Sequence, residues 1–233
     1  MRNEQIGTDN GEAWIEPGGP FVAGSRQVLK IVYRAGPRGI DTGGSVRFEF
    51  PYPFPFPQWQ SNSDEGFIAV RCSREGVKLR LSYEIPVPKK DEGFFYVTRW
   101  GRMVYVQVVE GRLEEGDTIE VTYGRTFHCT VPGVLIPYFA QIMEFTVATD
   151  VDGTRSAKFS GYTLCSRQPV VEIVGGPAAK LVAFADSVCK QGEQVRVRVV
   201  ARDFLGNTAL SQPREIEAVS YTHLRAHETS LHL

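Results

Sequence analysis

The chain alternates hydrophobic and polar residues with period two along most of its length. In the segment 26–34 (RQVLKIVYR), Leu29, Ile31 and Tyr33 fall on one side of an extended chain, and the other side carries charged residues. This alternation predicts a β-strand with one face in a core. The same pattern predicts strands at 45–50, 66–71, 77–84, 94–100, 103–110, 117–123 and 139–148.

The segments between these strands are rich in turn-forming residues. The chain holds 23 glycines and 14 prolines, and the predicted strands recur about every 10 to 15 residues. No apolar periodicity of helix length interrupts them. Short strands separated by turns, without alternating helices, are typical of an antiparallel β-sandwich. The sequence therefore predicts an all-β fold with very little helix.

A domain boundary is predicted at 174–177, where two glycines and a proline follow one another. Beyond it, strands at 180–184 and 194–202 and a turn at 203–207 read as the opening of a second sandwich. A sandwich of the immunoglobulin type needs about 100 residues, so this second one is expected to be incomplete. The expected organisation is a disordered N-terminus (1–11), a β-sandwich domain (12–174), an incomplete immunoglobulin-like domain (175–218) and a tail (219–233).

The tail (VSYTHLRAHETSLHL) contains three of the four histidines, His223, His227 and His232. Its first part, VSYTHLRAHET, resembles a translated sequencing adapter of the transposase type. On a helix, His223 and His227 would present two imidazoles on one face, as in a metal pair. We interpret the tail as an artefact and leave it outside the predicted domains. The natural chain is then expected to be interrupted near Ala218.

Few groups remain that could carry catalysis. Outside the tail, His128 is the only histidine, and its neighbour Cys129 would point to the opposite face of a strand. A nucleophile–base pair is therefore not expected there. The other cysteines, Cys72, Cys165 and Cys189, show no metal-binding spacing, and isolated buried thiols are expected. No catalytic residue is assigned from the sequence.

The segment 150–154 (DVDGT) resembles the start of a calcium loop, because alternate carboxylates followed by Gly can wrap a hard cation. A full EF-hand loop also needs a Glu at its twelfth position, where Gly161 stands. We therefore interpret the Asp-Gly pair as an ordinary turn. Neither a metal site nor a cofactor is predicted.

The most unusual segment is 50–59 (FPYPFPFPQW), in which prolines alternate with aromatic residues. Proline removes a backbone donor and favours an extended path, so this segment is not expected to form a central strand. One interpretation is a rigid crossover that packs its rings on the sandwich. The other is an aromatic strip that contacts a ligand or another domain through Phe54, Phe56 and Trp59. Both remain open at this point.

Charge and hydropathy give no sign of a nucleic-acid or membrane partner. Lys and Arg (26) nearly balance Asp and Glu (27), for a net charge of −1, and no basic cluster stands out. No segment approaches about 18 consecutive apolar residues. The N-terminus lacks the apolar core of a signal peptide. We expect a cytoplasmic protein.

Several stretches, in this order, resemble the N-terminal region of a domain-of-unknown-function family of bacterial PHP-like metal-dependent hydrolases. They are GIDTGGSVRF (39–48), GRLEEGDTIEVTYG (111–124), VDGT (151–154), PVVEIV (169–174), GPAA (176–179) and DFLGN (203–207). The resemblance lies in their order and spacing across about 200 residues, which is one or two domains in length. It implies β-sandwich segments first, the last of them similar to bacterial immunoglobulin-like modules.

The resemblance also implies a C-terminal catalytic domain with a His- and Asp-rich metal site. The Gly-Asp-x-His motif that opens this site has no match here, so no catalytic or metal residue is carried over. The expected role is a non-catalytic region whose partner is the missing C-terminal catalytic domain of the same chain. The alternatives are a carbohydrate- or peptide-binding module that uses the segment 50–59, and a plain structural spacer.

Overall fold

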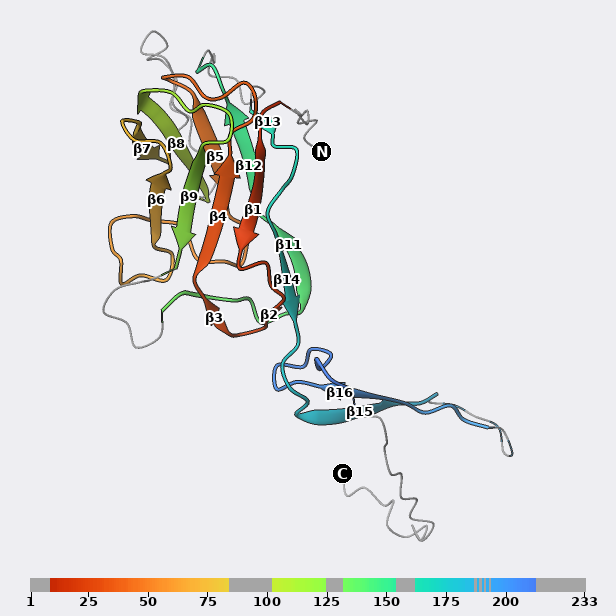
Figure 1. Cartoon of the computed structure of the whole chain (residues 1–233). Helices are drawn as coiled ribbons and strands as arrows, with labels where there is room; N and C mark the ends of the chain where they lie inside the picture. The colour runs from red at the N-terminus through yellow and green to blue at the C-terminus, as the bar shows by residue number, and fades with distance from the viewer. Residues whose placement is uncertain are drawn as a thin grey trace, which may run out of the picture.

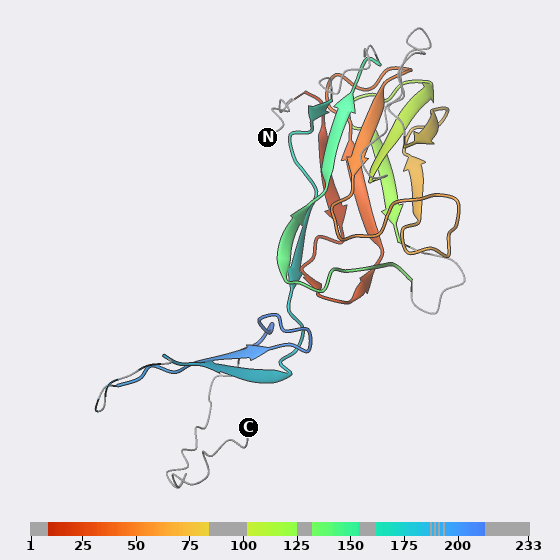
Figure 2. The ribbon, with the colours of Figure 1, turned by 180° about the vertical axis from the view of Figure 1, so that it is seen from behind.

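The computed structural model describes residues 9–83, 102–124, 132–153, 162–186, 188, 190, 192 and 194–212. Its elements in these ranges are all β-strands, labelled β1 to β16, so the predicted all-β class is confirmed. Two large antiparallel sheets face each other and form the main body, which we call the sandwich (Figures 1 and 2).

Each large sheet combines strands that are distant in sequence. The first has the order β1-β4-β9-β6 and consists of β1 (Glu12–Glu16), β4 (Leu29–Arg34), β9 (Thr118–Tyr123) and β6 (Ile68–Cys72). The second has the order β13-β12-β5-β8-β7. It consists of β13 (Thr163–Leu164), β12 (Thr146–Asp150), β5 (Ser45–Glu49), β8 (Met103–Glu110) and β7 (Lys78–Ser82).

The core between the two sheets follows the period-two pattern. In β4, Leu29, Ile31 and Tyr33 are fully buried, while Lys30 and Arg34 reach solvent. β9 alternates in the same way, with its isoleucine, valine and tyrosine turned inward. Burial of large apolar side chains is the main force that holds such layers together. The apolar face predicted from the sequence is therefore the face that packs against the opposite sheet.

A cluster of aromatic rings fills one end of the core. Phe50 packs edge-on against Tyr123, with ring centroids 4.8 Å apart, and Phe54 lies 5.1 Å from Phe145. The hydroxyl of Tyr123 donates a hydrogen bond to the carbonyl oxygen of Pro55 at 2.6 Å. Burial raises the pKa of this hydroxyl well above its ordinary value. Ring contacts of Phe50 and Phe54, together with the hydrogen bond from Tyr123 to the carbonyl oxygen of Pro55, thus hold the segment 50–59 against the core.

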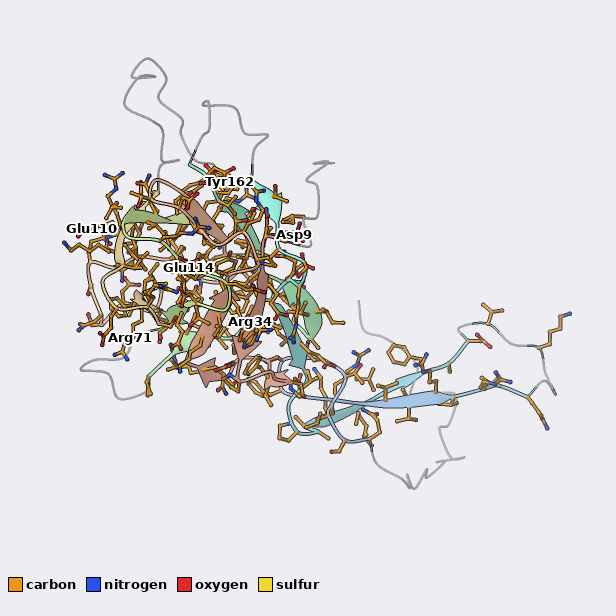
Figure 3. The ribbon with its side chains drawn as sticks, turned by 45° about the horizontal axis from the view of Figure 1, so that its top comes forward. Asp9, Arg34, Arg71, Glu110, Glu114 and Tyr162 are labelled. Carbon is orange, nitrogen blue, oxygen red and sulfur yellow. The ribbon has the colours of Figure 1, made fainter. Side chains whose placement is uncertain are left out.

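A second buried cluster lies on the outer face of the second sheet. Tyr105 and Tyr162 pack there with ring centroids 5.5 Å apart, beside Met103 and Ala148. The guanidinium of Arg47 lies 5.1 Å from the centre of the Tyr162 ring, and Tyr162 is labelled in Figure 3. The flat cation thus stacks on an aromatic face, an arrangement that stabilises buried Arg.

Three short strands form a smaller sheet below the main layers. Its order is β11-β14-β2, with β11 (Gln141–Glu144), β14 (Val170–Val174) and β2 (Phe21–Val22). β14 pairs antiparallel with β11 but parallel with β2. Nearby, β10 (Val134–Leu135) pairs with β3 (Arg26–Gln27). From β14 the chain runs directly into the second unit (Figure 1).

Most predicted strands are present with shifted ends. The predicted strand 139–148 is split at Phe145 into β11 and β12, because the chain pairs with β14 before this residue and with β5 after it. The predicted strand 94–100 lies outside the described residues. Residues 9–11, expected to be disordered, are placed, and Asn10 is buried with its carbonyl oxygen accepting a hydrogen bond from the Tyr33 hydroxyl. That boundary is therefore corrected.

The second unit (175–212) contains a two-stranded ribbon. β15 (Lys180–Phe184) pairs antiparallel with β16 (Arg198–Arg202). The first of these strands matches its predicted bounds, whereas the second begins four residues later than predicted. In both views the ribbon extends away from the sandwich (Figures 1 and 2).

The turn 203–207, which we call the junction turn, joins the second unit to the sandwich. The carboxylate of Asp203 accepts hydrogen bonds from the backbone N–H of Gly176 (2.9 Å) and of Asn207 (2.7 Å). The Asn207 side chain donates to the carbonyl oxygen of Tyr138 (2.8 Å) and accepts from the N–H of Ala140 (2.9 Å). The turn therefore holds both units.

The charge of Asp203 is stabilised by these contacts. Burial by itself would raise the pKa of the carboxyl, but the hydrogen bonds from Gly176 and Asn207 outweigh it and hold the pKa below its usual value. A buried carboxylate is tolerated because it is supplied with donors. Asp203 is thus a structural acid at the centre of the junction.

Candidate functional site

Phe54, one of the three rings singled out in the sequence, is part of the core. Its side chain is fully buried, 5.1 Å from Phe145 and 6.2 Å from Tyr123 between ring centroids. A turn closed by the hydrogen bond from the N–H of Phe54 to the carbonyl oxygen of Pro51 directs the ring inward. Phe54 is therefore corrected from a candidate ligand contact to a core residue.

Phe56, in contrast, reaches the surface with 53% of its area exposed. The guanidinium of Arg102 lies between two rings, 4.5 Å from the centre of Phe56 and 5.2 Å from that of Tyr52. Arg102 also donates to the carbonyl oxygen of Phe54 at 2.7 Å. This arginine therefore stacks on two exposed rings and fixes the loop that carries them.

Trp59 lies against the sandwich rather than away from it. Its ring is half-buried and packs on Tyr83, with centroids 4.4 Å apart. The Tyr83 hydroxyl donates to the carbonyl oxygen of Pro57 at 2.8 Å. Trp59 thus belongs to the packing of the crossover. Phe54 and Trp59 therefore agree with the interpretation of a crossover packed on the sandwich, whereas Phe56 agrees with that of an exposed aromatic strip.

A close approach of two backbones fixes the end of this crossover. A Cβ at Gly66 would lie 1.8 Å from the carbonyl oxygen of Phe56. We expect Gly66→Ala to lower the free energy of unfolding by about 1–3 kcal/mol, because the backbone must shift to relieve the overlap. Urea denaturation followed by circular dichroism measures this loss. Gly18→Ala is the matched control, since nothing lies within 4 Å of a Cβ there; equal losses in both variants would contradict the packing.

An open cleft of about 610 Å³ lies between the loop 51–57 and the segment 134–141. We call it the aromatic cleft. Its lining residues are Tyr52, Pro53, Pro55, Glu65, Leu135, Pro137, Tyr138, Phe139 and Gln141. Three of the rings are well exposed, Tyr52 by 79%, Phe139 by 69% and Tyr138 by 51%. Its volume is within the range of ligand pockets, about 300–1,000 Å³.

The polar groups of the aromatic cleft are few. The carboxylate of Glu65 forms an ion pair with Arg26. Gln141 contributes an exposed amide, and the two tyrosines contribute hydroxyl groups. The lining is otherwise apolar, with rings that are rigid and costly to leave in water. Chemically, the cleft is suited to hold an uncharged ligand by ring contacts and a few hydrogen bonds.

Comparison with models of protein families gives no match, and neither does comparison with curated proteins. The PHP-like resemblance therefore stays a prediction. In the described part of the chain, no helix has the length and apolar character needed to cross a membrane.

Sequence reasoning missed the main contributors to the aromatic cleft. Tyr52 lies in the segment 50–59, but the contact residues predicted there are Phe54, Phe56 and Trp59. Phe139 is the first residue of the predicted strand 139–148 and Tyr138 immediately precedes it, and no ligand contact is predicted for either. The run Pro137-Tyr138-Phe139 is a second proline–aromatic stretch, and matching it with the first would have indicated the two walls.

The other groups considered in the sequence do not form a site in the described residues. All four histidines, together with Cys129 and Cys189, lie outside them. Cys72 and Cys165 are free thiols, and burial raises the pKa of Cys165 to about 12, which disfavours the reactive thiolate. Within the described ranges, no group of three or more His, Cys, Asp or Glu side chains could hold a metal ion.

The described part of the segment 150–154 forms a turn. The guanidinium of Arg38 donates to the carboxylate of Asp152 at 2.9 Å. Gly153 has a φ of +61° and lies so close to Gly43 that a Cβ would be 2.4 Å from its carbonyl carbon. Glycine is favoured at such a position. This geometry agrees with the turn interpretation, and Thr154 lies outside the described residues.

Proposed function

We propose that this chain is a non-catalytic β-sandwich region that packs on and supports another domain of a larger PHP-like metallohydrolase. The observation that carries the proposal is the partly uncovered apolar face of the ribbon β15–β16. Its cross-strand pairs Leu181–Ala201 and Ala183–Val199 place four apolar side chains on one face, and of these Ala201 is buried whereas Leu181 and Ala183 are exposed. Leu181 is 53% exposed.

A two-stranded ribbon cannot bury such a face by itself. Isolated hairpins are marginally stable in water, and three or more strands or a covering layer are needed. Figure 3 shows the side chains of the ribbon standing out on both sides, in contrast with the dense packing of the sandwich. Further polypeptide that adds strands would complete this unit as an immunoglobulin-like module. The unit is therefore best understood as part of a longer protein.

The junction turn supports the packing role. Because Asn207, held by Asp203, bonds to Tyr138 and Ala140 of the sandwich, a domain that follows the second unit would be held in a defined orientation relative to the sandwich. A loosely linked pair of domains would need no such network. The sandwich thus has the connections of a scaffold rather than of a freely tethered module.

An unbroken genomic copy of the gene tests this proposal. We expect the reading frame to continue past codon 218 into a histidine-rich α/β domain. In the longer protein, the amides of β15 and β16 should exchange more slowly with solvent than in this chain, because added strands cover them. A stop codon at that point, or unchanged exchange in a longer protein, would refute the proposal.

A second candidate function is favoured by the exposed rings of the aromatic cleft. Rigid aromatic side chains that lie open to solvent are typical of recognition sites. In this function the chain is a carbohydrate- or peptide-binding module, with the site at Tyr52, Tyr138 and Phe139 rather than along the whole segment 50–59. Screening the chain against glycan and peptide arrays, with Tyr52→Ala alongside, tests it. Binding that survives this substitution would count against the cleft.

A further inference from the structure

The walls of the aromatic cleft are rigid before any ligand arrives. Pro53, Pro55 and Pro137 restrict the backbone of both walls. Arg102 ties the first wall by donating to the carbonyl oxygens of Phe54 and Pro51. Binding costs less conformational entropy when the contact groups of the protein are already fixed. The backbone that carries the exposed rings is thus restricted before a ligand binds.

The lining selects an uncharged ligand. Among the lining residues, Glu65 is the one that carries a charge, and Arg26 already neutralises it. A charged ligand group that entered this apolar space would lose water without gaining a partner. The cleft therefore favours an electrically neutral occupant that offers apolar surface.

The remaining polar groups favour a polypeptide over a sugar. The hydroxyls of Tyr52 and Tyr138 and the amide of Gln141 can donate hydrogen bonds. A polyproline II segment exposes backbone carbonyl oxygens that have no internal partner, and its proline rings fit between aromatic side chains. An oligosaccharide carries many hydroxyls that both donate and accept, and this apolar lining would leave most of them unpaired.

The position of the cleft also favours a polypeptide. Tyr138 lines the cleft with its side chain and accepts the hydrogen bond from Asn207 with its carbonyl oxygen. The cleft is therefore continuous with the contact between the two units, where the polypeptide of a multidomain protein passes. We propose that the aromatic cleft binds an uncharged, proline-rich segment in the polyproline II conformation. This inference rests on the second function above and names its ligand.

Fluorescence anisotropy with a labelled deca-proline peptide and the full chain tests the inference. We expect saturable binding, weakened at least about tenfold by Tyr52→Ala and by Phe139→Ala, because each removes an exposed ring of the cleft. Phe204→Ala is the matched control, since this phenylalanine is 89% exposed but lies in the junction turn outside the lining. Its affinity should equal that of the unchanged chain. Thermal unfolding of each variant verifies that the fold is kept.

Four results would overturn the inference. They are the absence of deca-proline binding, equal binding of a Gly-Ser peptide of the same length, binding unaffected by both ring substitutions, and binding of cellohexaose in place of deca-proline. The last result would leave the ligand-binding function intact with a sugar as its ligand. Failure of both deca-proline and the sugar to bind would remove that function as well. If Tyr52→Ala unfolds the chain, Phe139→Ala decides, because no ring contact of the described residues depends on it.

Discussion

Replacing Phe54 by Ala is expected to lower the free energy of unfolding by about 3–5 kcal/mol, because the substitution removes a fully buried ring and leaves a cavity beside Phe145 and Tyr123. The loss should be visible as a shift of the urea midpoint with an unchanged slope. Near-ultraviolet circular dichroism reports the aromatic cluster itself. The result would establish Phe54 as a core residue.

Phe56→Ala provides the control two residues further along the same segment. Its ring is about half exposed and stacks on Arg102, so the expected loss is about 0.5–1 kcal/mol. A loss in Phe56→Ala as large as that in Phe54→Ala would mean that the two rings do not differ in burial. The inward turn at Pro51 would then be incorrect.

Asp203→Ala is expected to destabilise the junction turn by about 3 kcal/mol, because charge-assisted hydrogen bonds are lost and the N–H groups of Gly176 and Asn207 are left without an acceptor. Hydrogen exchange of these two amides should accelerate by roughly a hundredfold. Amides in the middle of β4 serve as the internal control and should be unaffected. Unchanged exchange at Gly176 would show that the carboxylate does not hold the junction.

The same carboxyl gives the junction a pH dependence. The pKa of Asp203 is lower in the folded chain than in the unfolded one, so the charge contributes stability at pH values above the unfolded pKa of about 3.9. This contribution is lost as the pH falls through the folded pKa. We expect the protection of Gly176 to decrease in that acidic window, and Asp203→Asn to abolish this change. A decrease that persists in Asp203→Asn would assign it to another group.

The strands could be predicted because, within each strand, the alternation of apolar and polar residues indicates which side chains are buried. In β9, the alternation of inward Ile119, Val121 and Tyr123 with polar residues is complete within six positions. No knowledge of the partner strand is needed to see which face is apolar. The alternation also predicted the ribbon of the second unit, where the described residues bury Ala201 but leave Leu181 on the same face exposed.

Which aromatic rings of the segment 50–59 are buried and which are exposed could not be predicted in the same way. Tyr52, Phe54 and Phe56 are equivalent in the sequence, each between two prolines. One turn of the backbone buries Phe54 and leaves the other two at the surface. That turn depends on Arg102, which lies far along the chain. The distinction between core ring and surface ring is therefore a tertiary one.

The aromatic cleft was unpredictable for a related reason. Its two walls come from residues 51–57 and 134–141, which no local pattern connects. They meet because β10 pairs with β3 and because β11 pairs with β14 in the three-stranded sheet. The parallel pairing of β14 with β2 is equally invisible in the sequence, since it joins residues at opposite ends of the sandwich domain.

The central place of β14 in its sheet has a mechanical consequence. The strand lies between β11 and β2, and its last residue, Val174, leads directly to the second unit. A pull on that unit away from the sandwich acts along the strand, so the hydrogen bonds to both neighbours are strained together instead of opening one after another. Tension arriving from the C-terminal side would therefore be borne in shear, with the three-stranded sheet as the anchor point.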